Sequence, residues 1–176
     1  MDRILVIRTG GMTTAPNDFV SLVRQYVQLV ERASDTTAHA FLHSCARVLA
    51  RIYAAGIELP DVDPSDEDLT LQVESPLLPL RRLLGVYDNY FEVFDPYENE
   101  PAGEASLADD LSDIYLDLAR PLRAFERGRT TDAVWEWKFN IRGHGGDHLV
   151  DAMRAIHRAI NAHMPSDYVA GDERAG

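Results

Sequence analysis

The sequence predicts an all-α fold, a single-domain bundle of about five helices. Three observations lead to this prediction. Hydrophobic residues recur with the period of an α-helix in several long segments. Short stretches rich in proline, glycine and acidic residues separate these segments. With 176 residues, the chain is long enough to bury one hydrophobic core. We expect an N-terminal extension over residues 1–16, the helical domain over residues 17–164, and a disordered tail over residues 165–176.

The first segments predict two antiparallel helices after a short extended stretch. Residues 4–7 are apolar and could form a short strand before the domain. The first helix is expected to begin near Asn17, whose side chain can cap it. The second is expected to begin near Asp35 or Thr36 and to end at Gly56 as a left-handed cap. The connection between them is short, so the two helices should pack side by side.

The middle of the chain predicts a third helix and a short aromatic one. Ser75 followed by Pro76 is typical of a helix start, and leucines continue the pattern. Aromatic residues then gather over residues 87–97, and we expect a fourth, short helical segment there that packs on the core and ends before Asp95 and Pro96. Residues 98–105 are acidic and contain proline and glycine, which predicts a linker.

Two long helices complete the expected bundle. Ser106 can cap the first, which has a regular apolar seam and contains Pro121, where a bend is expected. The second begins at Thr130 or Thr131 and continues to residue 164. Glycines at 143, 145 and 146 weaken it within four positions, which predicts a bend or a very close approach of another helix.

Charge and composition exclude several classes of function. The net charge is −12, which argues against binding nucleic acid through its phosphates and against binding an anionic membrane surface. The single cysteine, Cys45, excludes an intrachain disulfide. No segment is long and apolar enough to span a bilayer. These observations favour a cytoplasmic protein whose partner is a protein with a basic surface, or a divalent metal ion.

One cluster of residues offers metal-binding chemistry. On the helix that begins at Ser106, Asp110 and Asp117 point within about 20° of each other, and Asp113 lies nearby. On the last helix, His144 and His148 are four residues apart, a spacing at which two imidazoles can hold one ion. Carboxylates and imidazoles on facing helices form metal sites in bundles. The set predicted to hold a divalent metal is therefore Asp110, Asp113, Asp117, His144 and His148.

Three functional hypotheses follow from these residues. The first is a non-enzymatic interaction or adaptor domain, in which the histidines and aspartates form a structural polar network. The second is a metal-binding protein, with a metal-bound water as the nucleophile of a hydrolase. The third is a ligand pocket between the aromatic segment and Trp135 and Trp137. The zinc-protease motif is excluded because Gly145 follows the first histidine. Enzymatic activity is left open.

The sequence also resembles a bacterial family known as domain of unknown function 5063. The resemblance is carried by three stretches: residues 90–97 (YFEVFDPY), residues 106–118 (SLADDLSDIYLDL), and residues 133–139 (AVWEWKF) continuing through His144, Gly146 and His148 to residues 151–157 (DAMRAIH). It implies an all-helical bundle and no particular activity. The chain differs at Gly145, where the family usually has tryptophan, which predicts looser packing beside His144.

Overall fold

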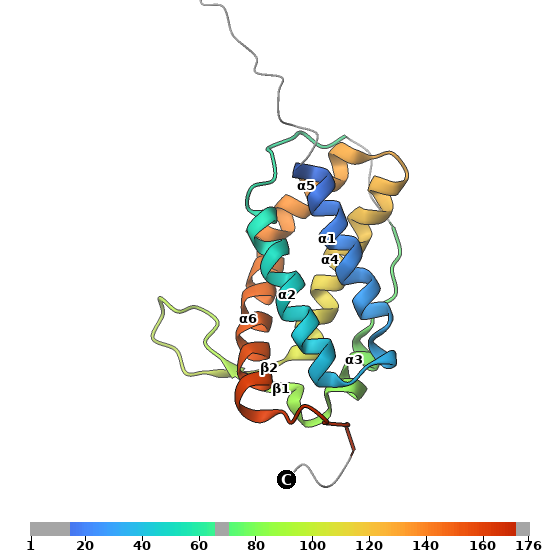
Figure 1. Ribbon diagram of the computed structural model, residues 1–176. Helices are drawn as coiled ribbons and strands as arrows, with labels where there is room; N and C mark the ends of the chain where they lie inside the picture. The colour runs from blue at the N-terminus through green and yellow to red at the C-terminus, as the bar shows by residue number, and fades with distance from the viewer. Residues whose placement is uncertain (1–14, 66–70, 172–176) are drawn as a thin grey trace, which may run out of the picture.

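The protein is a bundle of α-helices with one small sheet at its side (Figure 1). The computed structural model describes residues 15–65 and 71–171. Its helices are α1 (Ala15–Glu31), α2 (Ala38–Gly56), α3 (Leu77–Leu84), α4 (Leu107–Glu126), α5 (Thr130–Arg142) and α6 (His144–Arg158). Its strands are β1 (Asn89–Glu92) and β2 (Gly103–Ser106), which pair antiparallel. The predicted single-domain, mostly helical bundle is confirmed.

Helix α4 lies at the centre and contacts α1, α3, α5 and α6. Its apolar seam is buried, as the four- and three-residue spacing predicts. Ser106 caps it, because its Oγ accepts a hydrogen bond from the backbone N–H of Asp109 at 3.2 Å. Two buried side chains tie α4 to its neighbours. The Tyr26 hydroxyl donates to the Leu111 carbonyl at 2.8 Å, and the Trp137 indole donates to the Leu118 carbonyl at 3.0 Å.

The helix α4 continues through Pro121. Proline has no N–H, so the carbonyl of Asp117, four residues earlier, loses its usual helical donor. The side-chain amide of Asn140 on α5 lies 3.5 Å from that carbonyl oxygen and compensates in part. Pro121 therefore leaves the Asp117 carbonyl free to accept a hydrogen bond from the side chain of Asn140 on α5.

The sequence was wrong to place one helix between Thr130 and residue 164. The structure separates α5 from α6 at Gly143. At Gly146, an added Cβ would collide with the carbonyl oxygen of Ile141, which is backbone and cannot move aside cheaply. The glycines thus allow α6 to begin directly against the end of α5.

The predicted fourth helix is also wrong, because the aromatic segment forms a β-hairpin. The helix α3 ends at Gly85, whose φ of 55° is in the left-handed region, and a 3₁₀ turn follows at Gly85–Tyr87. In β1, Tyr90 and Glu92 are turned inward and Phe91 is exposed, which is the two-residue alternation of a strand. The register pairs Asn89 with Ser106 and Glu92 with Gly103, so the predicted linker, residues 98–105, contains three of the four residues of β2.

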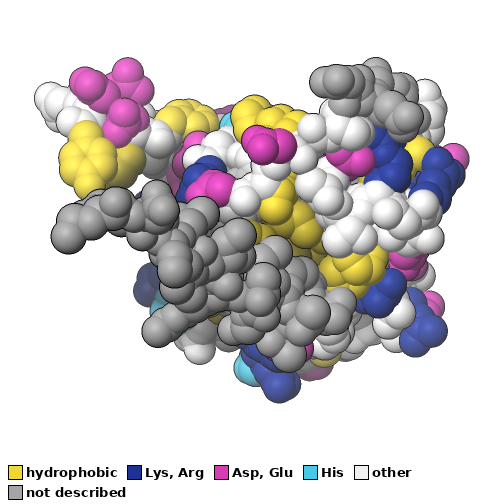
Figure 2. All heavy atoms as spheres, turned by 90° about the horizontal axis from the view of Figure 1, so that it is seen from above, with side chains coloured by type: hydrophobic (Ala, Val, Ile, Leu, Met, Phe, Trp, Pro, Cys, Tyr) yellow, Lys and Arg dark blue, Asp and Glu magenta, His cyan; other side chains and the backbone are white. Residues whose placement is uncertain are grey.

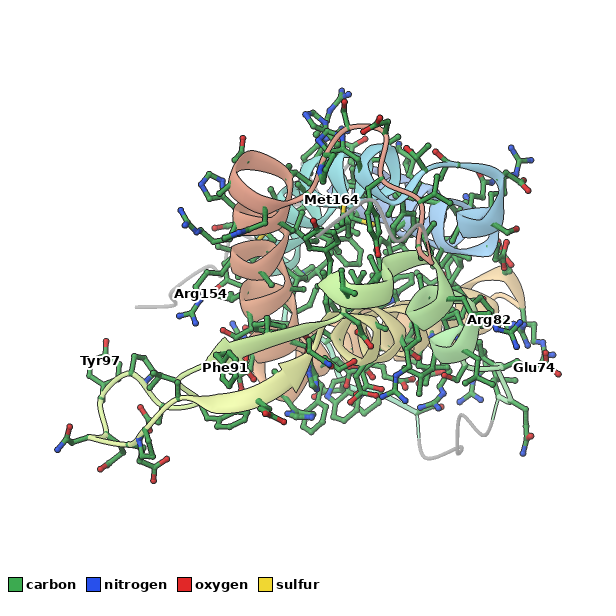
Figure 3. The ribbon with its side chains drawn as sticks, turned by 90° about the horizontal axis from the view of Figure 1, so that it is seen from below. Glu74, Arg82, Phe91, Tyr97, Arg154 and Met164 are labelled. Atoms are coloured by element: carbon green, nitrogen blue, oxygen red, sulfur yellow. The ribbon has the colours of Figure 1, made fainter. Side chains whose placement is uncertain are left out.

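The hairpin projects from the helical body. Figure 2 shows acidic side chains beside hydrophobic ones on this projection, at the left edge of the view. Figure 3 shows Phe91 near the base of the hairpin and Tyr97 far out along it. Among the described residues, the hairpin therefore forms an arm that extends beyond the helices (Figure 1).

Helix ends differ from the prediction in detail. α1 is described from Ala15, before the predicted start. The N-cap of α2 is Thr37, whose Oγ1 accepts from the N–H of Ala40 at 3.3 Å. Gly56 is the last residue of α2 and lacks a positive φ. It is glycine because Ile141 packs against it, and a Cβ there would overlap the Ile141 side chain.

The C-terminal segment packs on the bundle where the sequence predicted a disordered tail. After a π-helical turn at Ala159–His163, Tyr168 is buried and its hydroxyl donates to the Leu84 carbonyl at 3.2 Å. Residues 172–176 and the predicted strand at residues 4–7 lie outside the described residues. In the described parts, none of the helices has the length and apolarity needed to cross a bilayer.

Candidate functional site

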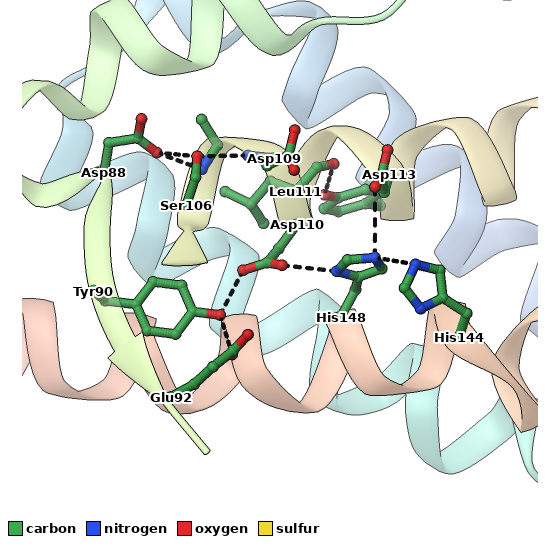
Figure 4. Close-up of polar contacts among 12 residues, drawn as sticks. Asp88, Tyr90, Glu92, Ser106, Asp109, Asp110, Leu111, Asp113, His144 and His148 are labelled. Carbon is green, nitrogen blue, oxygen red and sulfur yellow. Dashed lines mark hydrogen bonds and ion pairs between the residues drawn. The ribbon is translucent and has the colours of Figure 1, made fainter. Parts of the chain in front are cut away.

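A chain of hydrogen-bonded side chains connects the hairpin to α4 and α6 (Figure 4). The hairpin contributes two side chains from β1, and each of the two helices contributes two more. We call this set the carboxylate–histidine network. It comprises Tyr90, Glu92, Asp110, Asp113, His144 and His148.

Asp110 is the centre of the network. It is buried, and each of its oxygens contacts a different element. Oδ1 lies 2.8 Å from Nδ1 of His148 on α6, and Oδ2 lies 2.7 Å from the Tyr90 hydroxyl on β1. The same hydroxyl lies 2.7 Å from Oε2 of Glu92, which is also buried. One aspartate on α4 therefore joins the hairpin to α6.

The number of protons at Tyr90 constrains the network. A tyrosine hydroxyl carries one proton and can donate to only one of the two carboxyl groups beside it. The Tyr90 oxygen lies 2.7 Å from both groups, so either Glu92 or Asp110 can accept this hydrogen bond. The pKa of Tyr90 is raised, first by burial and then by its bonds to Glu92 and Asp110.

The outer end of the network consists of two histidines. Nε2 of His148 lies 2.8 Å from Nε2 of His144 and 3.5 Å from Oδ2 of Asp113. The hydrogen bond to Asp110 raises the pKa of His148, which favours the imidazolium form against partial burial. A protonated His148 donates from both nitrogens, to Asp110 and to His144. Because His144 is exposed, the network runs from a buried glutamate to solvent.

Asp117 lies beside this network and packs against Gly145. A Cβ added at Gly145 would lie 2.5 Å from Asp117 Oδ2 and 3.0 Å from the Asn140 carbonyl oxygen. The expectation of loose packing beside His144 is therefore wrong, since the space next to Gly145 is filled. Burial raises the pKa of Asp117, and the nearby charge of Asp113 raises it further.

Asp151 is a titratable group that adjoins the same residues. Its pKa is raised to about 6, first by burial and then by the negative charge of Glu92. Asp151 lies on α6, three residues after His148, and the charge of Asp110 also contributes to its raised pKa. Glu92 and Tyr90 were missed, because the segment that carries them was interpreted as helical. The alternation of inward Tyr90 and Glu92 with outward Phe91 is visible only in the structure, because a four-residue strand is too short to show it in the sequence.

The structure brings all five predicted metal-site residues to the contact between α4 and α6. Asp110, His148 and His144 are joined directly, Asp113 lies at 3.5 Å from His148, and Asp117 adjoins Gly145. Within residues 15–65 and 71–171, no group of three or more His, Cys, Asp or Glu side chains is arranged to hold a metal ion. The polar atoms of the carboxylate–histidine network contact one another through hydrogen bonds and ion pairs.

The hairpin carries three exposed aromatic side chains. Phe91 is 66% exposed, Phe94 is 65% exposed and Tyr97 is 96% exposed. Residues 89–106 include five Asp or Glu residues and no Lys, Arg or His. An added Cβ at Gly103 would lie 2.5 Å from the Phe94 ring, so Phe94 rests on the opposite strand. The hairpin thus displays aromatic rings on an acidic background.

The base of the hairpin is fixed to the helices by Asp88. Its Oδ1 accepts hydrogen bonds from the Ser106 hydroxyl and the Ala108 N–H, both at 2.8 Å. Its carbonyl accepts from the Leu107 N–H at 2.8 Å, and its Oδ2 lies 3.6 Å from the Arg81 guanidinium. Together with Tyr90 in the network, these contacts hold the hairpin at a defined angle to the bundle.

In the part of the chain that the structure describes, the aromatic segment and the two tryptophans lie apart. Trp137 is fully buried in the core, in contact with the rings of Phe19 and Phe125. Trp135 stacks on Phe139 at the surface, with ring centroids 5.2 Å apart, and lines a shallow pocket of about 300 Å³ beside residues 61 and 62. The hairpin lines a different pocket, at the other end of the bundle.

Comparisons with known proteins identify relatives without assigning an activity. A crystal structure of protein BF1032 from Bacteroides fragilis has the same fold, with a TM-score of 0.75 and 22% sequence identity, over 89% of this chain and 98% of that one. A comparison with curated proteins gave no match. The family model described as "Domain of unknown function (DUF5063)" matches residues 12–163. The chain therefore belongs to the DUF5063 family.

Proposed function

We propose that this chain is a non-enzymatic protein-interaction domain whose contact element is the β1–β2 hairpin. The observation that carries the proposal is the set of exposed rings, Phe91, Phe94 and Tyr97, on a projecting element. Large rings exposed together on a soluble protein mark interaction sites, and aromatic residues are enriched among those that contribute most to binding.

Charge indicates the chemistry of the partner. The hairpin carries only acidic charge, and the whole chain has a net charge of −12. A basic protein surface with an apolar depression would complement both the rings and the carboxylates. Part of the attraction would be screened by salt, because the carboxylates at the hairpin are mostly exposed.

The contacts at the base of the hairpin support the proposal. The bonds of Asp88 and the bonds of Tyr90 fix the hairpin before a partner arrives. An element that is already ordered loses less conformational entropy on binding than a flexible one. The carboxylate–histidine network has a structural role in this proposal, since it positions the binding element.

Site-specific photo-crosslinking in cells tests the proposal. A photoreactive phenylalanine analogue would replace Tyr97 in one variant and the exposed Ile57 of the body in another. We expect a specific crosslinked protein with a basic surface from position 97 and none from position 57. The purified partner should then bind the wild-type chain directly. Crosslinks to the same protein from position 57, or no specific product from position 97, would contradict the proposal.

A metal measurement separates this proposal from the predicted metal-dependent alternative. We expect untagged protein to contain no stoichiometric metal and to keep its melting temperature in chelator. Stoichiometric metal that is lost in both Asp110→Asn and His148→Gln would instead assign the function to the carboxylate–histidine network.

A further inference from the structure

A pocket of about 470 Å³ lies between the base of the hairpin and the C-terminal end of α6. Its volume is in the range of small-molecule sites. Aromatic side chains form one wall, and basic side chains form the other. The six residues that matter for its chemistry are Tyr87, Tyr90, Phe91, Arg154, Arg158 and His163.

The aromatic wall is held in place before any ligand binds. The Tyr87 hydroxyl donates to the His163 carbonyl at 2.9 Å, and its ring meets that of Tyr168 edge to face, with centroids 4.7 Å apart. The Tyr90 hydroxyl is held by Glu92 and Asp110. A ligand would not have to order these two rings, which favours binding.

The basic wall is unusual for this chain. Acidic residues number 29 against 17 Lys and Arg, yet no Asp or Glu is among the described residues that line the pocket. Arg154 and Arg158 are four residues apart and thus on one face of α6. Figure 3 shows Arg154 on α6 beside the base of the hairpin that bears Phe91.

The two arginines differ in their present partners. Arg154 donates to the Phe91 carbonyl at 3.3 Å, and its charge partly opposes the rise that burial and Glu92 cause in the pKa of Asp151, one turn earlier on the helix. Arg158 makes no ion pair within the described residues. A guanidinium has five N–H donors in a planar fork that matches carboxylate, sulfonate and phosphate oxygens. Arg158 therefore has all its donors available for an acidic group in this pocket, and Arg154 has those that remain beside its bond to Phe91.

We propose that this pocket binds a small amphipathic anion, with an aromatic or branched apolar body against the tyrosines and Phe91 and an acidic group against Arg158 and Arg154. The proposal does not depend on the role of the hairpin in protein binding. It adds a second site at the base of the same element.

Fluorescence titration with 8-anilinonaphthalene-1-sulfonate, an aromatic sulfonate, tests the site. We expect saturable binding of one dye per chain. Binding should weaken about tenfold in Arg158→Gln, because a charge-assisted hydrogen bond is lost, and further in the double variant Arg154→Gln/Arg158→Gln. N-phenyl-1-naphthylamine, which has a similar ring system without the sulfonate, should bind far more weakly. Melting temperatures of all variants are measured in parallel, and Arg158 is exposed, so the fold should be retained.

A matched control is available on the other side of the molecule. A surface concavity of about 490 Å³ is also lined by two arginines, Arg47 and Arg51, but by no aromatic residue. The variant Arg47→Gln/Arg51→Gln should bind the dye like wild type. The proposal is overturned if no saturable binding occurs, if the uncharged compound binds equally well, if Arg158→Gln has no effect, or if the control variant loses binding instead.

Discussion

At the scale of single residues, Asp110 links more of the molecule than any other side chain described in the network. Its two oxygens contact His148 and Tyr90, so α4, α6 and β1 meet at one carboxylate. Sequence periodicity grouped Asp110 with Asp117 on one helix, and spacing grouped His144 with His148 on the next, so these carboxylates and imidazoles were predicted to meet. It could not find Tyr90 or Glu92, because their approach depends on the hairpin register, which pairs residues far apart in the chain.

The raised pKa of Asp151 leads to a prediction about stability. The carboxyl of Asp151 has a pKa of about 6 in the folded protein and about 3.9 in the unfolded chain. At a pH above both values the carboxyl is ionised in both states, and its charge then destabilises the folded state. Asp151→Asn should therefore increase the free energy of unfolding at pH 7.5 by about 1 kcal/mol, discounted for partial exposure of the side chain. Urea denaturation measures this, with the exposed Asp167→Asn as the control. If Asp151→Asn instead lowered the free energy of unfolding at pH 7.5, burial and the charge of Glu92 would not raise the pKa of Asp151.

The glycines between α5 and α6 lead to a second prediction. Gly146→Ala should destabilise the protein by about 2 kcal/mol or more, because the new methyl group meets the backbone of Ile141. Gly143→Ala is the control, since its Cβ would lie 3.3 Å from the nearest atom and needs only a small adjustment. Thermal melting compares the two variants. Equal losses would show that close approach of the helices is not the reason for Gly146.

At the scale of elements, the sequence predicted the long helices well and the hairpin not at all. The seam of α4 was readable because it repeats over 20 residues. Each strand has only four residues, which is too short for an alternating pattern to compete with an aromatic cluster that also fits a helix. The break at Gly143 was visible as a run of glycines, yet whether they bend or end a helix depends on the neighbouring backbone.

The anchoring of the hairpin by Tyr90 can be measured directly. Tyr90→Phe removes the hydroxyl that joins β1 to Asp110 and leaves two buried carboxyl groups without their shared donor. We expect amide hydrogen exchange in β1 and β2 to accelerate about tenfold, while the core of α4 stays protected. Tyr97→Phe, at an exposed position, is the control. Unchanged exchange in Tyr90→Phe would mean that Asp88 alone holds the hairpin.

At the scale of the whole molecule, Asp117, Asp151 and His148 all favour the folded state more as the pH falls. The raised pKa of His148 gives stability that is complete below about pH 6.5 and is lost as the pH rises through the folded value. The raised pKa values of Asp151 and Asp117 give a penalty that shrinks as the pH falls. Asp61 and Asp132 have lowered pKa values, so they stabilise the folded state at neutral pH. That stabilisation is lost only when the pH falls through the usual pKa range of a carboxyl group.

The free energy of unfolding should therefore be larger at pH 5.5 than at pH 7.5. Urea denaturation at the two pH values measures the difference, and the variant His148→Gln/Asp151→Asn should reduce it. His157→Gln, at an exposed position on the same helix, should leave it unchanged. A protein that is more stable at pH 7.5 would contradict the electrostatic description of the network.

The central claim is that the hairpin binds a protein partner, and the affinity of hairpin variants tests it most directly. With the crosslinked partner purified, calorimetry would compare the wild-type chain, Phe94→Ser/Tyr97→Ser, and the control Phe139→Ser. Phe139 is 63% exposed on α5, so the control removes a ring as exposed as that of Phe94 from outside the hairpin. We expect the hairpin variant to bind at least about tenfold more weakly, with the control unchanged and binding weakened by salt. Equal affinities of wild type and hairpin variant, or a loss confined to Phe139→Ser, would contradict the claim.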